Sequence, residues 1–199
     1  MAGLLFLAFV YFAVAQAAVT RGGGQTAADA AALAAAQDAR EQLRDGWLDV
    51  ILDPAEWDGY LHGDGYLADQ ACRQAELFAA RNRAEVPDGG CTPVEKGFRV
   101  QIRTLDAVGV PGADKQHAVA SATAVLEPRC SFDVPEPTPP PSPTTPTPTG
   151  SATPEPTPTP SREPEPITGL VCGGVEWVID PDHPRLPDAA DLFTVRLAD

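Results

Sequence analysis

Basic residues are scarce in this sequence. Lys and Arg number 14 against 28 Asp and Glu, so the formal net charge at pH 7 is -14. Nucleic acids and anionic lipid headgroups are bound by basic surfaces, so both are poor candidates as partners. The negative charge instead indicates a chain that is soluble wherever it lies outside a bilayer.

Recognisable catalytic motifs are also missing. The sequence has no G-x-S-x-G, no H-E-x-x-H, no G-x-x-x-x-G-K-[ST], and no G-x-G-x-x-G in a strand–turn–helix setting. Most Ser and Thr residues lie in a proline-rich tract, where a nucleophile could not be held in place. We therefore expect no enzymatic activity, no catalytic residue and no cofactor.

Histidine is limited to three residues, two of which stand near carboxylates. The best candidate cation site is the segment 180–184 (DPDHP), with Asp188 and Asp191 close by, because carboxylates and imidazole can bind a divalent ion. An acidic turn punctuated by prolines is the better interpretation. His62-Gly63-Asp64 is a weak candidate for the same reason, and a loop turn is the better interpretation, so we predict no metal site.

Charged residues are absent from Ala2 to Val19, which contain a single amide, Gln16. As a helix this run would measure about 27 Å, close to the ~30 Å hydrocarbon core of a bilayer. We predict a transmembrane anchor over residues 1–21. The alternatives are cleavage as a signal peptide after Ala15-Gln16-Ala17 and a buried core helix, but the basic leader of a signal peptide is missing. Because membrane helices usually have a polar lead-in, we expect the natural start to lie upstream.

Cysteines are few but even in number, and they lack both a C-x-x-C spacing and a histidine at metal-ligand spacing. Behind an export-type segment they indicate two disulfides, and hence a domain outside the cytoplasm. We predict Cys72–Cys91, which ties a helix to the loop after it, and then Cys130–Cys172. Arg21 alone would favour the opposite orientation, but one residue is a thin basis for the positive-inside rule.

An alanine-rich segment follows the glycine triplet at 22–24. Residues 25–44 (QTAADAAALAAAQDAREQLR) are mostly strong helix formers. We expect a helix over 22–46, ended by Gly46 and weakened by the triplet where it meets the anchor. Its face is lined by methyl groups and suits close contact with another helix; a simple stalk is the alternative. The candidate contact residues are Ala30, Leu33 and Ala34.

Residues 47–134 are expected to form the first part of an exported α+β domain. A helix over about 65–84 would bury a stripe that includes Leu67, Ala71 and Phe78. Residues 96–107 and 117–127 alternate between apolar and polar side chains, which predicts an antiparallel hairpin. We expect four aromatic residues to pack in the core, with a ligand groove as the alternative: Trp47, Trp57, Tyr60 and Tyr66.

Residues 135–166 are rich in Pro, Thr, Ser and Glu and cannot bury apolar area, so we expect a disordered linker. A docking site for a proline-recognition module would need a cytoplasmic address, against which the cysteines argue. Residues 167–199 are too short for a core of their own. They contain three strand-like pieces that we expect to return to the main sheet, so that the tract is a loop inserted into one domain.

The segment 17–40 resembles the N-terminal region of the TadE/TadG-like Flp pilus-assembly proteins, particularly the TadG-related form of high-GC Gram-positive bacteria. The resemblance rests on an apolar run followed by an Arg, by Gln25 and by AADAAALAAA at 27–36. It implies a membrane-anchored, pseudopilin-like or minor pilus component whose partners are other pilus-assembly proteins. Family members commonly carry a longer charged lead than this sequence, so processing by a prepilin peptidase is not inferred. No catalytic residues carry over.

We therefore predict an α+β protein with an N-terminal transmembrane helix that continues into an Ala-rich helix. A small antiparallel sheet with helices follows, interrupted by the Pro/Thr-rich loop. The expected function is that of a single-pass cell-membrane protein, with its C-terminal domain extracytoplasmic, that serves as a structural or assembly component. The alternative is a tethered extracytoplasmic module that binds a cell-wall or small-molecule ligand through its aromatic cluster.

Overall fold

The computed structural model describes residues 2–107, 116–133 and 165–198. The fold is α+β with antiparallel strands, as predicted, but the strands form two sheets and not one. The helices are α1 (Ala2–Asp49), η1 (Pro54–Glu56), α2 (Trp57–His62), α3 (Ala68–Arg81) and α4 (Ala189–Leu192). The strands are β1 (Ala84–Glu85), β2 (Cys91–Val94), β3 (Gly97–Ala107), β4 (His117–Pro128), β5 (Cys130–Phe132), β6 (Ile167–Cys172), β7 (Val175–Ile179) and β8 (Phe193–Leu197).

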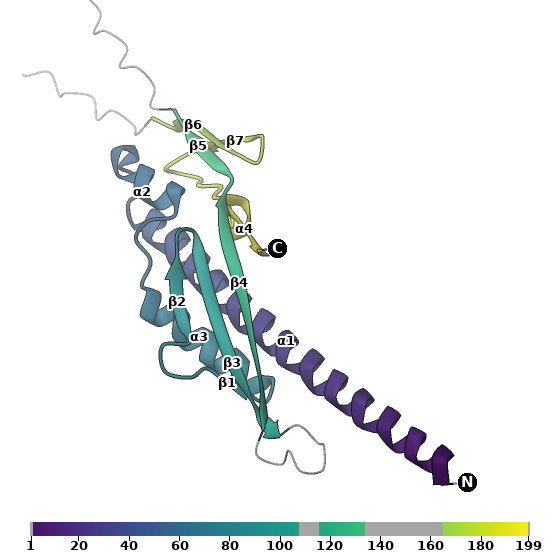
Figure 1. The fold of residues 1–199 in the computed structure, drawn as a ribbon. Coiled ribbons are helices and arrows are strands. Elements are labelled where there is room, and N and C mark those ends of the chain that lie inside the picture. The colour runs from purple at the N-terminus through teal and green to yellow at the C-terminus, as the bar shows by residue number, and fades with distance from the viewer. Residues whose placement is uncertain (1, 108–115, 134–164, 199) are drawn as a thin grey trace, which may run out of the picture.

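The long helix α1, of 48 residues, organises the fold (Figure 1). Its C-terminal part contacts both α3 and strands β3 and β4, whereas its N-terminal part projects beyond them. Large apolar side chains on the projecting part are exposed, from 41% for Val10 to 78% for Tyr11. Among the described residues, no helix combines the length and the apolar character needed to cross a membrane.

The glycine triplet lies within α1, which continues from the apolar run into the Ala-rich segment, as the predicted continuous helix requires. A Cβ added at Gly22 or Gly23 would meet nothing within 4 Å, whereas Gly24 is buried and a Cβ there would lie 3.5 Å from the Thr104 methyl group. Glycine lowers helix propensity by about 1 kcal/mol relative to alanine but removes no backbone hydrogen bond. The triplet therefore marks the place where α1 leaves the domain, without breaking the helix.

Gly46 does not end α1, which continues to Asp49. A Cβ at this position would lie 2.5 Å from Cε1 of Tyr60, so the ring needs the space that a missing side chain leaves. The chain then turns back through η1 and α2. This turn places Trp57 beside Trp47, with ring centroids 5.3 Å apart.

Small side chains line the contacts of α1 with its neighbours. Facing elements also present methyl groups, from Ala122 and Ala124 on β4 and from alanines on α3. Methyl groups let backbones approach closely while still excluding water. The alanines of α1 that are 0% exposed are Ala27, Ala28, Ala31, Ala32, Ala35, Ala36 and Ala39.

The second helix, α3, is shorter than the predicted 65–84, and Ala84 already belongs to β1. Its buried stripe is made of Ala71, Ala75 and Ala79. Leu67, which we placed on that stripe, is 66% exposed. Alanine takes the buried positions because α3 packs closely against α1.

The predicted hairpin is formed by β3 and β4, and its connecting residues lie outside the described part of the chain. Phe98, Val100 and Ile102 face inward and are fully buried, as the alternation indicated. On the other side of β3, β2 pairs with its start and β1 with its later part. On the other side of β4 lies β8, which completes this main sheet.

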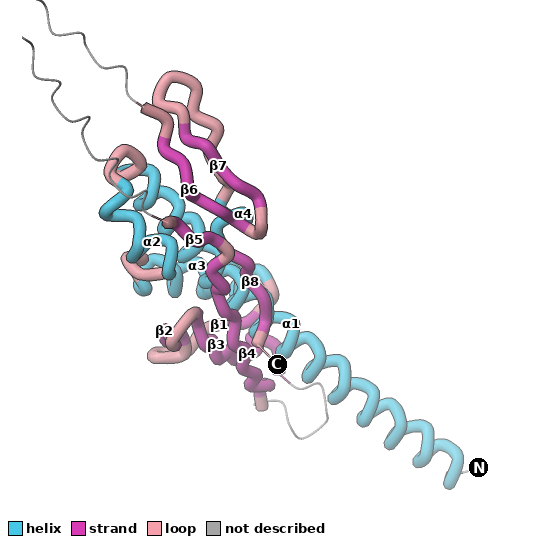
Figure 2. The backbone as a smooth tube through the Cα atoms, turned by 90° about the horizontal axis from the view of Figure 1, so that it is seen from above, coloured by secondary structure: helices cyan, strands magenta, loops and turns pink. Residues whose placement is uncertain are grey.

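Only one of the three C-terminal strand pieces returns to the main sheet, so that prediction is wrong for the other two. Strands β6 and β7 form a separate sheet with β5, at the end of the molecule away from the N-terminus (Figure 2). The chain leaves β4 and enters β5 within two residues, and Phe132 of β5 packs on Trp57 with ring centroids 4.6 Å apart. This contact directs the second sheet toward α2.

Both predicted disulfides are present. Cys72–Cys91 joins α3 to β2, and Cys130–Cys172 joins directly paired positions of β5 and β6. The proline-rich tract predicted over 135–166 lies outside the described residues, apart from 165 and 166. Its flanking strands are neighbours in one sheet, which agrees with an insertion into a single domain.

Candidate functional site

Strand β8 covers only part of β4. The ladder joins residues 124–128 of β4 to β8, and the Ala198 amide then donates to the Thr123 carbonyl at 2.8 Å. Residues 119–122 of β4 pair with β3 on one side, but no described strand lies on their other side. We call this stretch the β4 edge. It lies close to the point where α1 leaves the domain.

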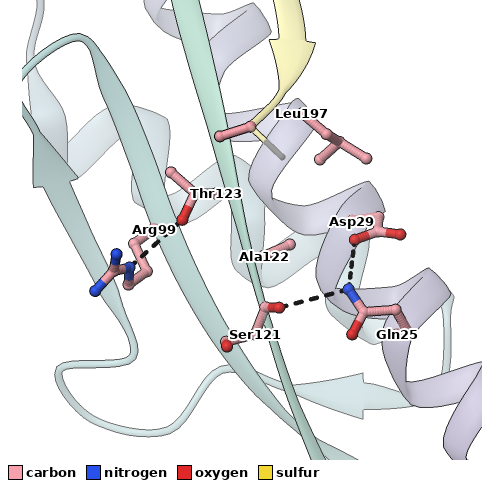
Figure 3. A pocket seen from close by; sticks show the side chains of 8 residues that line it. Gln25, Asp29, Arg99, Ser121, Ala122, Thr123 and Leu197 are labelled. Atoms are coloured by element: carbon pink, nitrogen blue, oxygen red, sulfur yellow. Dashed lines mark hydrogen bonds between the residues drawn. The ribbon is translucent and has the colours of Figure 1, made fainter.

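A hollow of about 440 Å³ opens beside the β4 edge (Figure 3). The Gln25 amide Nε2 donates to Asp29 Oδ1 at 2.7 Å and to the Ser121 carbonyl at 3.4 Å. The hollow is therefore a polar groove between helix and sheet. It is lined by Gln25, Asp29, Arg99, Ser121, Ala122, Thr123, Leu197 and Ala198.

Four arginines lie on or next to strands of the main sheet, and one of them, Arg99, lines this groove. Three of them pair with carboxylates: Arg83 with Asp106, Arg103 with Glu85, and Arg196 with Glu127. The hydrogen bond from Arg196 holds the pKa of Glu127 below its usual range. Arg99 differs, because its Nε lies 3.4 Å from the Thr123 hydroxyl and no described carboxylate pairs with it.

The groove is suited to binding and carries no catalytic arrangement of the described residues. His117 is not among the residues that line the groove, and its Nδ1 lies 2.7 Å from the Thr104 carbonyl. Nowhere in the described ranges do three or more His, Cys, Asp or Glu side chains gather as metal ligands. The groove offers backbone groups of a sheet edge, a guanidinium and a carboxylate, which together can hold an extended polar segment.

The acidic segment near the C-terminus is engaged in local structure. Asp180 Oδ1 accepts the amide of Asp182 at 2.9 Å, which holds a turn. The Asp188 amide donates to the Asp191 carboxylate at 2.9 Å, at the start of α4. These contacts agree with the acidic turn that we preferred to a cation site.

His62 and Asp64 lie by a second hollow, of about 240 Å³, whose wall also includes Tyr66, Glu95 and Lys96. His62 Nδ1 lies 2.8 Å from the Asp58 carbonyl within α2. Burial, aided by the charge of Asp64, raises the pKa of the Tyr66 phenol. We predicted a loop turn at His62-Gly63-Asp64; His62 instead ends α2, and the turn begins at Gly63.

The four aromatic residues do not form an open ligand groove. Trp47 and Trp57 are 0% exposed, and the Trp57 indole donates to the Val50 carbonyl at 3.0 Å. Tyr60 and Tyr66 are half-buried, and Tyr66 packs on Phe98. The tryptophans therefore belong to the core, as we preferred, and leave no ring face for a ligand.

The expected helix-contact residues divide between the inside and the surface of the domain. Ala34 is 5% exposed and belongs to the domain's own interior, so it cannot meet another protein's helix. Ala30 and Leu33 are half-buried. The Ala-rich face is thus used mostly within the chain, against the sheet and α3.

Sequence reasoning missed the groove at the β4 edge. The alternation of β4 predicts a strand, but no local pattern tells where its neighbour ends. One signal was available: residues 118–123 (AVASAT) are all small or β-branched and uncharged, which is unusual for an exposed edge.

No protein-family model matches this chain, and neither a characterised protein nor a solved structure proved significantly similar to it.

Proposed function

We propose that this protein is an exported, membrane-anchored structural or assembly component related to Flp/Tad pilus biogenesis. One observation carries the proposal: α1 is a single continuous helix. Its C-terminal part packs in the domain, and its N-terminal part presents large apolar side chains to the outside. A helix built in this way joins a folded domain rigidly to an apolar environment.

The exposed side chains of the projecting part support the anchoring. Large apolar residues of this part, such as Leu4 at 74% and Phe6 at 68%, are exposed around the helix. A contiguous apolar surface of this kind marks a contact with lipid or with another protein. The apolar part enters a bilayer and leaves the domain at its surface. Arg21, the first charged side chain after the apolar run, then lies at the interface.

The disulfides support export. Two cysteine pairs are joined in the described domain, and such bonds persist in oxidising compartments. The resemblance of residues 17–40 to TadE/TadG-like proteins supports the pilus-related role. The structure adds a physical argument for an assembly role, because parallel apolar helices of neighbouring subunits can pack together in the plane of the membrane.

The alternative function, a tethered ligand-binding module, has less support. It depended on four aromatic side chains, and both tryptophans are fully buried. Only Tyr66 lines a described hollow, the one beside His62. We therefore place this alternative second.

Flotation of the full chain with neutral phosphatidylcholine vesicles tests the anchoring. We expect the protein to float with the vesicles and the double variant F6R/F9R to remain at the bottom, since each arginine near a bilayer centre costs about 3 kcal/mol. The matched control is L77R, because Leu77 is 52% exposed and Phe9 is 56% exposed, but Leu77 lies on α3. Failure of the native protein to float would overturn the anchoring.

Oligomer size in bilayer nanodiscs tests the assembly role. Leu33→Lys changes a half-buried side chain of α1 while leaving the fully buried alanines in place. We expect this substitution to shift the native protein toward smaller species. An oligomeric state that does not change would count against assembly through α1 and would leave the anchoring result untouched.

A further inference from the structure

We propose that the hollow beside His62 binds a small zwitterion, a molecule about the size of an amino acid that carries one ammonium and one carboxylate group. The hollow lies between the turn after α2 and the turn from β2 to β3. This inference goes beyond the proposed function and does not depend on it. It also differs from the aromatic ligand groove considered above, because charged side chains hold the ligand.

Side chains of both charge signs line this hollow without pairing with one another. Asp64 and Glu95 carry carboxylates and Lys96 carries an ammonium, and none of the three forms an ion pair with a described residue. Such an arrangement suits a ligand that brings the complementary charge to each group. A zwitterion does so with one molecule, because its ammonium fits the carboxylates and its carboxylate fits Lys96.

The Tyr66 phenol adds a neutral hydrogen-bonding group to the same hollow. Its ring packs on Phe98, with centroids 5.5 Å apart, and its hydroxyl forms no hydrogen bond with a described residue. A phenol can accept a hydrogen bond from an ammonium and donate one to a carboxylate, so it serves either end of a zwitterion. The ring and Leu126 also give the hollow an apolar wall.

The first wall of the hollow is held in place by hydrogen bonds to two helices. The Asp64 amide donates to the Gly59 carbonyl of α2 at 2.8 Å, which closes the turn after that helix. The Leu67 amide donates to Gln42 Oε1 of α1, also at 2.8 Å. The short segment that carries Asp64 and Tyr66 is therefore tied to the domain at both of its ends.

The second wall of the hollow, the turn from β2 to β3, is also held in place. Val94 pairs with Gly97, so Glu95 and Lys96 form a two-residue turn between the strands. The Lys96 carbonyl accepts the Leu126 amide of β4 at 2.8 Å. Because both walls are already ordered, a ligand loses little free energy in ordering them, which favours binding of a small molecule.

The size of the hollow limits the size of the ligand. Its volume of about 240 Å³ lies below the ~300–1,000 Å³ of pockets that hold drug-sized molecules. An amino acid is smaller than a drug-sized molecule and already carries both charges. Since Leu126 and the Tyr66 ring form an apolar wall, an amino acid with an apolar side chain is the expected class of ligand.

Backbone chemical shifts of the full chain in detergent, measured by NMR, test the proposal. The probes are the L and D forms of alanine, leucine and phenylalanine, whose apolar side chains differ in size. We expect at least one probe to shift the backbone amides of Asp64 and Lys96 in a saturable manner. Its carboxamide, which lacks the carboxylate, and its N-acetyl form, which lacks the ammonium, should each bind at least about tenfold more weakly. No saturable shift with any probe up to about 10 mM, or an analogue that binds as tightly as its amino acid, would overturn the proposal.

Two variants assign the two ends of the zwitterion to the protein's charges. Lys96→Gln should weaken binding of the amino acid about tenfold and leave binding of its carboxamide unchanged. The double variant D64N/E95Q should weaken binding of the amino acid to a similar extent and leave binding of its N-acetyl form unchanged. The matched controls are Arg73→Gln and Asp69→Asn, which remove exposed charges of α3 that do not line the hollow and should not alter binding. Equal weakening by the variants and the controls would show a general effect of charge and would contradict the site.

Discussion

The two parts of α1 differ in how they use apolar side chains. In the projecting part, large residues such as Phe6 and Leu7 are 68% and 64% exposed. In the part that lies in the domain, alanines such as Ala31 and Ala35 are 0% exposed. Both parts belong to one continuous helix, and the more hydrophobic part is the one that the domain leaves uncovered.

This difference shows that side-chain size, more than hydrophobicity, decides which part of α1 forms the core. The domain encloses the helix with β3, β4 and α3, and the elements that face it also carry alanine. Because these methyl groups are closely packed, there is no space for a row of Phe or Leu side chains between α1 and its neighbours. The large side chains of the projecting part require neighbours that are packed less closely, and lipid or neighbouring helices provide them.

The largest effect is expected when one residue in each part of α1 is replaced by a larger one, which tests whether the two parts differ in packing. We expect Ala35→Leu to lower the free energy of unfolding by about 1–3 kcal/mol, because a fully buried methyl site cannot accept a larger side chain. Ala8→Leu, at an exposed position of the projecting part, should leave it unchanged. Chemical denaturation in detergent would measure both. Equal tolerance at the two positions would refute close packing of the alanine part.

Gly46→Ala tests the packing at the C-terminal end of α1, where the Tyr60 ring contacts the helix. The new Cβ would lie 2.5 Å from the Tyr60 ring, so the ring must move. We expect a net loss of about 1 kcal/mol, because the gain in helix propensity offsets part of the overpacking. Gly46→Ala combined with Tyr60→Ala should recover most of that loss in a double-mutant cycle, and a simple sum of the two effects would show that the clash is not its cause.

Gly22→Ala and Gly23→Ala should have the smallest effect and the opposite sign. An added Cβ at either position meets nothing within 4 Å, so only the helix propensity changes, by about 1 kcal/mol in favour of the helix. Amide exchange in this part of α1 should slow about fivefold per substitution, as measured by NMR in detergent. Faster exchange would mean that these glycines make contacts the described chain does not contain.

The sequence predicted much of the fold, namely the parts in which a local pattern is compatible with only one structure. Alternation in β3 predicted that Phe98, Val100 and Ile102 face inward, and the helix followed by a turn before Cys91 predicted the first disulfide, which left Cys130 and Cys172 for the second. Prediction from the sequence failed where contacts with other helices and strands decide which residues are buried. Hydrophobicity placed Leu67 in the core, but the close approach of α3 to α1 selects Ala71 and its neighbours.

The candidate site was beyond local patterns for the same reason. Its residues come from α1, β3, β4 and β8 and from Ala198 just after β8, and only the folded chain brings them together. A strand pattern indicates that β6 and β7 are strands but not which sheet they join. Roles that depend on which elements lie side by side therefore require the three-dimensional structure.

The smooth alanine surface of α1 also affects how the molecule carries mechanical load. The side-chain hydrogen bonds that tie α1 to the rest of the described chain come from Gln25, Gln42 and Arg44. Methyl groups form low ridges, so a force along the helix axis meets little interlocking between α1 and the sheet. Resistance to sliding rests on these polar ties and on Leu43 and Trp47, two large and fully buried side chains near the inner end of the helix. A pull on the apolar end is therefore transmitted along the whole of α1 to its far end.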